Sequence, residues 1–152
     1  MELGTAIAEI ASATGVIITL AYLAYQISQT NRIAKSAVVR EIEQEYIALY
    51  TAIATDTDFS NLITKLRDSS YTADSEVEDE KIENFAVWLA SIWLNVQACY
   101  DQGQMEKKTF PLYLEDVKAK LERWPAVRPY VKTVMERYPT IKGMDIYREI
   151  FR

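Results

Sequence analysis

Residues 10–31 form the longest hydrophobic stretch of the chain, with 22 residues in a row that carry no charge. Glu9 precedes the stretch and Arg32 follows it. At about 1.5 Å per residue, a helix of this length covers roughly the hydrocarbon core of a bilayer. The stretch therefore predicts a single transmembrane anchor over residues 1–31, with residues 32–152 as a helical domain. Its Ala, Ser and Thr content leaves a second interpretation open, a helix buried inside a bundle.

Small and polar residues recur on one face of this predicted helix at alternating steps of three and four, the spacing of a heptad a/d seam. The opposite face carries Ile17, Leu20 and Leu23, which suit lipid. Lipid does not drive apolar helices together, so association in a bilayer depends on small residues and interhelical hydrogen bonds. This face, the polar seam, is therefore predicted to contact another helix or water. The polar seam consists of Ser12, Gly15, Thr19, Tyr22, Gln26 and Gln29.

Two functions follow from the polar seam. The first is a packing contact that makes the protein a homo-oligomer or joins it to a different membrane protein. The second is a small homo-oligomeric ion channel, in which Ser12 and Thr19 line the pore. Packing is the commoner use of such a face, so self-association is the first prediction and the channel is the alternative.

Positive residues follow the hydrophobic stretch at Arg32, Lys35 and Arg40. The positive-inside rule places this flank in the cytoplasm and the N-terminus outside. The short N-terminal segment carries Glu2 and Glu9 and has no basic region, which argues against a cleaved signal peptide.

The pattern beyond the stretch is helical. No Gly or Pro occurs between Val16 and Gln102, which favours helices over hairpins. We expect the first helix to continue to Thr55, because a second stripe steps by three and four. That stripe is Val39, Ile42, Tyr46, Leu49 and Ile53.

A second uncharged run, residues 84–100, lies within a predicted helix over 76–102. Ser75 and Glu78 fit a capping box at its start, and Gly103 is expected to cap its end. Asn95 and Gln97 interrupt the apolar part of this run. This favours a central helix of the bundle, although a second membrane span stays open as an interpretation.

Shorter helices complete the predicted all-α bundle of four or five helices. They are expected over residues 62–67, from Thr109 and Pro111 to Trp124, over residues 130–138, and from Ile146 to Phe151.

Composition excludes several classes of function. The net charge of −5 and a pI near 4.9 argue against nucleic-acid binding. The chain has no His, and its one Cys, Cys99, lies in the most apolar of the helices predicted after residue 55, the one over 76–102, where an inert buried thiol is expected. The carboxylates at Glu41, Glu43 and Glu45 lack the His of di-metal bundles and are interpreted as a solvated face. We therefore predict neither an enzyme nor a bound metal or cofactor.

The stretch from Gly15 to Arg32 also resembles a known pattern. Gly15-Val16-Ile17-Ile18-Thr19-Leu20, then Tyr22-Leu23-Ala24, Gln26-Ile27, Gln29 and Asn31-Arg32, is similar to the opening of small bacterial single-pass membrane proteins of unknown function. The resemblance covers about a quarter of the chain. It implies an apolar membrane segment followed by an all-α cytoplasmic domain, and it implies no activity. From the residues themselves we predict a non-enzymatic protein of the bacterial inner membrane with a structural, adaptor or regulatory role.

Overall fold

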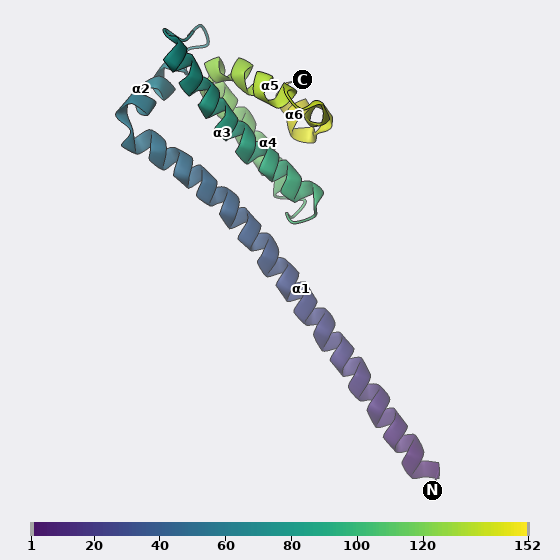
Figure 1. The fold of residues 1–152 in the computed structure, drawn as a ribbon. Helices are drawn as coiled ribbons and strands as arrows, with labels where there is room; N and C mark the ends of the chain where they lie inside the picture. The colour runs from purple at the N-terminus through teal and green to yellow at the C-terminus, as the bar shows by residue number, and fades with distance from the viewer. Residues whose placement is uncertain (1, 152) are drawn as a thin grey trace. The chain divides into compact units, whose positions relative to one another are not determined.

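The computed structural model describes the backbone of residues 2–151 and the side chains of residues 12–151. Over this range the chain consists of helices joined by loops and contains no strand, which confirms the all-α prediction (Figure 1). The α-helices are α1 (Glu2–Thr55), α2 (Thr57–Lys65), α3 (Glu76–Asp101), α4 (Phe110–Arg123), α5 (Arg128–Glu136) and α6 (Asp145–Ile150). Two short 3-10 helices, η1 (Pro125–Val127) and η2 (Pro139–Gly143), lie between them.

The helix α1 runs without a break to Thr55, as the absence of Gly and Pro after Val16 predicts. The chain divides into two compact units, residues 1–37 and residues 38–152, so α1 contributes to both. This division falls six residues beyond the predicted boundary after Asn31.

The predicted transmembrane helix lies in the first unit. Among the described residues, no helix combines the length and the hydropathy that a membrane crossing requires. The predicted span begins at Ile10, so the side chains of Ile10 and Ala11 lie outside the described residues. The membrane span therefore stays a prediction of the sequence.

The helix α3 is the centre of the second unit, and α4, α5 and α6 pack against it. The uncharged run from Asn84 to Tyr100 lies in this helix, and most of its large side chains are buried. Phe85 packs edge-to-face against Phe59 of α2 and against Trp124, with ring centroids 5.6 and 5.3 Å apart. This run therefore forms the central helix of the bundle, which is the interpretation that the sequence favoured.

The predicted stripe on the second part of α1 faces this core. Ile42 and Leu49 are completely buried, and Tyr46 and Ile53 are partly buried against the same cluster. Val39 at the start of the stripe is half-buried beside a surface groove. Heptad spacing in residues 39–53 thus predicted the inner face of this helix correctly.

The caps of α3 also follow the sequence. Ser75 is the N-cap, and its hydroxyl accepts a hydrogen bond from the Glu78 amide at 3.2 Å. The Glu78 carboxylate binds the Asp74 amide at 2.8 Å rather than that of Ser75, so the capping box is shifted by one residue. At the other end Gly103 has φ +69°, and the Gly103 and Gln104 amides bind the Tyr100 and Cys99 carbonyls in a Schellman motif.

Two helices begin and end earlier than predicted. The short helix expected over residues 62–67 is α2, which begins at Thr57 because the Asp56 carboxylate accepts the Phe59 amide at 3.0 Å and caps it. The helix expected over residues 130–138 is α5, which begins at Arg128 and has Pro129 within its first turn, where a missing N–H costs nothing.

Candidate functional site

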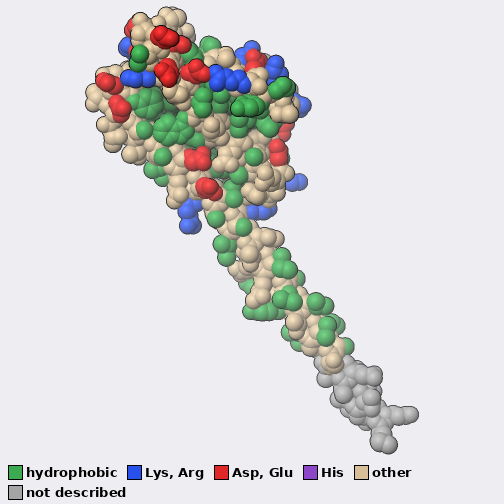
Figure 2. All heavy atoms as spheres, viewed as in Figure 1, with side chains coloured by type: hydrophobic (Ala, Val, Ile, Leu, Met, Phe, Trp, Pro, Cys, Tyr) green, Lys and Arg blue, Asp and Glu red, His purple; other side chains and the backbone are tan. Residues whose placement is uncertain are grey.

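The polar seam lies on α1 in the first unit, and all six of its side chains are exposed. The face opposite is exposed as well: Ile17, Leu20 and Leu23 keep 66%, 60% and 46% of their surface open. Figure 2 shows hydrophobic and uncharged side chains along the visible face of this segment, whereas acidic and basic side chains gather on the second unit. Residues 12–31 therefore present an uncharged surface on every side.

The polar atoms of the seam are partly satisfied within their own helix. The Thr19 hydroxyl donates a hydrogen bond to the Gly15 carbonyl at 2.8 Å, and the Gln29 amide donates to the Tyr25 hydroxyl. A methyl group added at Gly15 would meet no atom within 4 Å. Gly15 therefore has no packing role among the described residues of a single chain, and any constraint on its size has to come from outside that chain.

The predicted positive flank is spread along α1. Arg32 and Arg40 are exposed and Lys35 is half-buried. Arg32 and Lys35 belong to the first unit and Arg40 to the second. No ion pair joins any of the three to another described residue, so their charges remain open to solvent or to an acidic partner.

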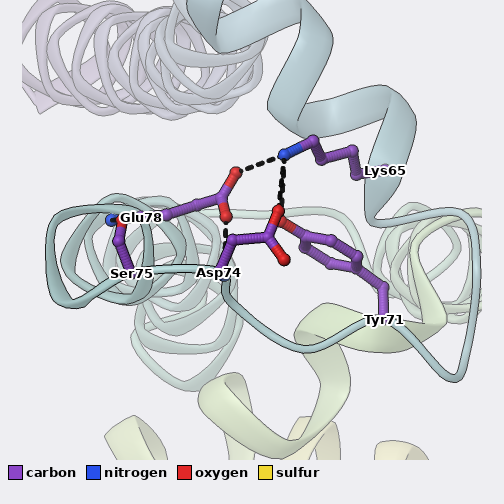
Figure 3. A network of polar contacts seen from close by, with 5 residues as sticks. All are labelled: Lys65, Tyr71, Asp74, Ser75 and Glu78. Atoms are coloured by element: carbon purple, nitrogen blue, oxygen red, sulfur yellow. Dashed lines mark hydrogen bonds and ion pairs between the residues drawn. The ribbon is translucent and has the colours of Figure 1, made fainter.

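A polar network that sequence reasoning did not find surrounds Lys65, at the end of α2 (Figure 3). Its ammonium binds the Glu78 carboxylate at 2.8 Å, the Asp74 carboxylate at 3.2 Å and the Tyr71 hydroxyl at 3.3 Å. The bond to Lys65 is the largest cause that lowers the pKa of Glu78 to about 2, and the bond to Glu78 is the largest cause that raises the pKa of Lys65 above its usual range. The Lys65 network ties the end of α2 to the start of α3 and fixes the loop between them.

A cleft of about 560 Å³ lies beside this loop, between the loop, α3 and α5. Two pairs of side chains from facing helices meet in it: the Tyr130 hydroxyl donates to the Asp79 carboxylate, and Arg137 forms an ion pair with Glu83. The bond to Asp79, followed by burial, raises the pKa of Tyr130 to about 12. Tyr130 therefore keeps its proton at neutral pH and is not an activated base.

The charged groups of the cleft are thus paired with one another across α3 and α5. That arrangement joins two helices of the bundle and provides no activated nucleophile. Among the described residues, no group of three or more His, Cys, Asp or Glu side chains is placed to hold a metal ion. Glu41 and Glu43 are exposed, as expected for a solvated face, while Glu45 is half-buried near the Asn95 amide.

A second polar cluster lies at the contact between α1 and α4. The Trp93 indole donates to the Tyr46 hydroxyl at 3.1 Å, and the buried Lys120 ammonium lies 4.2 Å from the centre of the Tyr46 ring and pairs with Asp116. Burial is the main cause that raises the pKa of Tyr46 above its usual range. The spacing of Asp116 and Lys120 on one helix was the available signal, but a sequence cannot tell a buried pair from an exposed one.

Cys99 is buried on α3, and its thiol lies 3.5 Å from the Asn95 side-chain oxygen. Burial first, and then the nearby Glu41 and Glu45 carboxylates, raise the pKa of this thiol. Both effects disfavour the thiolate, which is the nucleophilic form. The environment of Cys99 therefore matches the inert thiol that the sequence predicted.

Comparisons with known proteins identify no relative. No protein-family model, no curated protein and no solved structure matches this chain. The similarity of residues 15–32 to small bacterial membrane proteins therefore stays a prediction.

Proposed function

We propose that this chain is a self-associating, membrane-anchored protein without catalytic activity. In this proposal residues 10–31 insert into the bacterial inner membrane with the N-terminus outside, and copies pair through the polar seam. The helical domain then stands at the cytoplasmic surface and has a structural, adaptor or regulatory role. The observation that carries the proposal is the exposure of every large apolar side chain described in the uncharged part of α1.

The free energy gained by burying these exposed side chains supports a surface that lipid or another protein covers. Val16, Ile17, Ile18, Leu20 and Ile27 each keep more than half of their surface open in a single chain. Burying a side chain of this kind contributes about 1.5–3 kcal/mol relative to leaving it in water. Several such residues on one helix give a strong drive toward lipid or toward another apolar surface, and monomeric water-soluble domains rarely present so large a patch.

The polar residues of the same stretch link insertion to self-association. Ser12, Gln26 and Gln29 make a single inserted helix costly, because lipid offers their side chains no partner. Pairing two seams removes these groups from lipid and brings small residues such as Gly15 into contact. Insertion and pairing are therefore expected to stabilise each other.

Membrane extraction tests the anchor. Membranes from cells that express the full chain are washed with alkaline carbonate or with urea, and both fractions are assayed. The chain is expected to stay with the membrane. Release into the supernatant contradicts the anchor.

The seam is tested by a matched pair of substitutions. Gly15→Leu places a bulky side chain on the polar seam, and Ala24→Leu places the same side chain on the opposite face. A Cβ added at Gly15 meets no atom within 4 Å among the described residues, so a loss of the oligomer in Gly15→Leu would point to a contact outside the single chain. Gly15→Leu is expected to dissociate the oligomer in mild detergent, and Ala24→Leu to leave its mass unchanged. Equal masses for both variants contradict the seam contact.

The same preparation tests the ion channel. A dimer leaves no room for a pore between helices, whereas a ring of several copies could enclose one. Thr19→Leu would place an apolar ring in such a pore and stop conduction by dewetting while assembly persists. A conductance that Thr19→Leu removes without changing the mass of the oligomer would replace the adaptor role by a channel.

A further inference from the structure

A second exposed face of α1 lies in the second unit, away from the core. Ile47 keeps 63% of its surface open and Tyr50 keeps 42%, although both stand on a helix that buries Leu49 completely. At about 100° per residue, Ile47 points roughly 140° or more away from Ile42 and Leu49. Tyr50 lies about 60° from Ile47 around the helix, so Ile47 and the exposed part of Tyr50 form a face that the described core does not cover.

The positions on this face continue the spacing of the polar seam in the sequence. From Gln29 the alternating steps of four and three lead through Ile33 and Ser36 to Arg40, and onward through Glu43 and Ile47 to Tyr50. All of these side chains are exposed. Helices pair in a left-handed coiled coil when apolar residues recur at this spacing, and Ile33, Ile47 and Tyr50 are the apolar residues of this line. The continued face consists of Arg40, Glu43, Ile47 and Tyr50.

We infer that the continued face pairs with the same face of a second copy, as a parallel two-stranded coiled coil. The parallel direction rests on the proposed function, because two copies anchored in one bilayer enter the cytoplasm side by side. The pairing itself rests on spacing, exposure and charge.

Charge complementarity identifies a second copy as the occupant. Arg40 and Glu43 occupy neighbouring a and d layers, and an a residue packs into a hole that includes the partner's adjacent d residue. Each Arg40 guanidinium therefore meets the Glu43 carboxylate of the other copy, twice by symmetry. Within one chain, neither side chain has an ion pair or a hydrogen bond with another described residue. Two charges that are unpaired in the monomer are thus paired in the dimer.

The apolar residues of the continued face favour a coiled coil of two helices. Ile47 falls at an a position, where a β-branched residue favours a two-stranded coil. Tyr50 at the next d position also borders a groove of about 430 Å³, which is lined in part by Tyr46, Leu112 and Tyr113. In the dimer, side chains beside the continued face of the second copy's α1 would extend over this groove and cover the exposed Leu112.

Cysteine cross-linking of the full chain tests the pairing and its direction. In a Cys99→Ala background, Ile47→Cys is compared with Ala48→Cys, an exposed neighbour that points away from the seam. In a parallel coil the two Ile47→Cys thiols meet across an a layer, so oxidation is expected to cross-link this variant roughly tenfold more than the Ala48→Cys control. Equal yields overturn the inference.

An antiparallel dimer gives a different pattern. It would place residue 47 opposite residue 36, so a mixture of Ile47→Cys and Ser36→Cys chains with different tags would cross-link to each other but not to themselves. That pattern overturns the parallel arrangement.

Charge reversal provides an independent readout of the same interface. Arg40→Glu and Glu43→Arg each place like charges in neighbouring layers and should weaken the dimer, whereas the double reversal restores opposite charges and should recover it. A double variant as weak as the single ones overturns the Arg40–Glu43 pairing.

These tests can fail separately from the anchor. They are carried out on the membrane fraction and on any protein that carbonate releases. Released protein whose Ile47→Cys variant still cross-links contradicts the anchor and supports the pairing. Retained protein without that cross-link supports the anchor and overturns the pairing.

Discussion

Two uncharged runs of this chain, residues 10–31 and residues 84–100, have opposite environments. The second run lies in α3 and carries the core of its unit, with Phe85, Leu89 and Trp93 almost completely buried. The described part of the first run lies in α1, and all of its side chains are exposed. Neither run contains a charged residue. The absence of charge therefore does not by itself distinguish a helix that is buried in a core from a helix whose surface must be covered by lipid or by another chain.

The difference between the runs lies in side-chain size and in neighbours. Residues 84–100 include the large rings of Phe85 and Trp93. Phe85 packs against Phe59 of α2 and against Trp124, and the Trp93 indole bonds Tyr46 of α1. Residues 10–31 carry aliphatic residues on one face and small or polar residues on the other, and the described backbone of their unit is α1 alone. Large aromatic rings with partners build a core, while a helix without partners leaves its surface for lipid or for another chain.

The largest contrast is expected between Trp93→Ala and Ile17→Ala. Trp93 is fully buried and its indole bonds Tyr46, so its removal should lower the free energy of unfolding by about 3–5 kcal/mol. Ile17→Ala should leave the free energy of unfolding unchanged. All three Trp residues lie in the second unit, so denaturant unfolding followed by tryptophan fluorescence reports that unit. Similar losses for both variants would break the comparison.

A matched pair of glutamines gives the next largest effect. The buried Gln97 side chain accepts the Ile146 amide at 3.0 Å and donates to Asp101 at 2.9 Å. Gln97→Ala leaves the Ile146 amide unsatisfied and should cost about 1–3 kcal/mol of unfolding free energy. Gln26→Ala, on the exposed polar seam, should leave unfolding unchanged. A neutral Gln97→Ala would show that α6 does not depend on α3 for its position.

Two glycines should respond in different ways to the same methyl group. Gly103 has φ +69°, so Gly103→Ala strains the Schellman motif and should cost about 1 kcal/mol. Gly15 lies inside a helix with open space around it, so Gly15→Ala should raise helix propensity and leave the unfolding of the second unit unchanged. Thermal melts of the two variants, measured side by side, check this contrast.

The smallest effect concerns acid stability. The pKa of Glu78 is lowered to about 2 in the folded chain, whereas an unfolded Glu titrates near pH ~4.3. Its contribution is therefore complete above about pH 4.3 and is lost as the pH falls toward about 2. Glu78→Gln should lower the melting temperature at pH 6, and the difference from the unmodified chain should shrink on acidification. A difference that does not change with pH would contradict the role of the Lys65 network. Residues 10–31 contain no carboxylate, so this dependence belongs to the second unit.

Periodicity and punctuation predicted much of the fold. The stripe through Ile42 and Leu49, the Ser75 cap and the Gly103 cap follow local rules that one stretch of sequence contains. The start of α2 was predicted five residues too late, because Asp56 was not recognised as its N-cap. The start of α5 was predicted two residues too late, because Pro129 lies within the first turn of the helix, where proline is accepted.

The cleft and the Lys65 network could not be predicted in the same way. Asp79 and Tyr130 are 51 residues apart, and Glu83 and Arg137 are 54 residues apart. Pairs of this kind depend on how α3 and α5 pack, which no local pattern encodes. The polar seam was predicted from spacing alone. Its residues and those of the opposite face are all exposed, so the contact through the seam stays a prediction.

The most direct test of the account is the accessibility of residue 17 in membranes. In a Cys99→Ala background, Ile17→Cys and Tyr138→Cys replace side chains that are 66% and 61% exposed in a single chain. A water-soluble maleimide should label Tyr138→Cys quickly and leave Ile17→Cys unlabelled until the protein is denatured, because lipid or a second copy covers residue 17. Equal labelling of the two cysteines in untreated membranes would contradict the account.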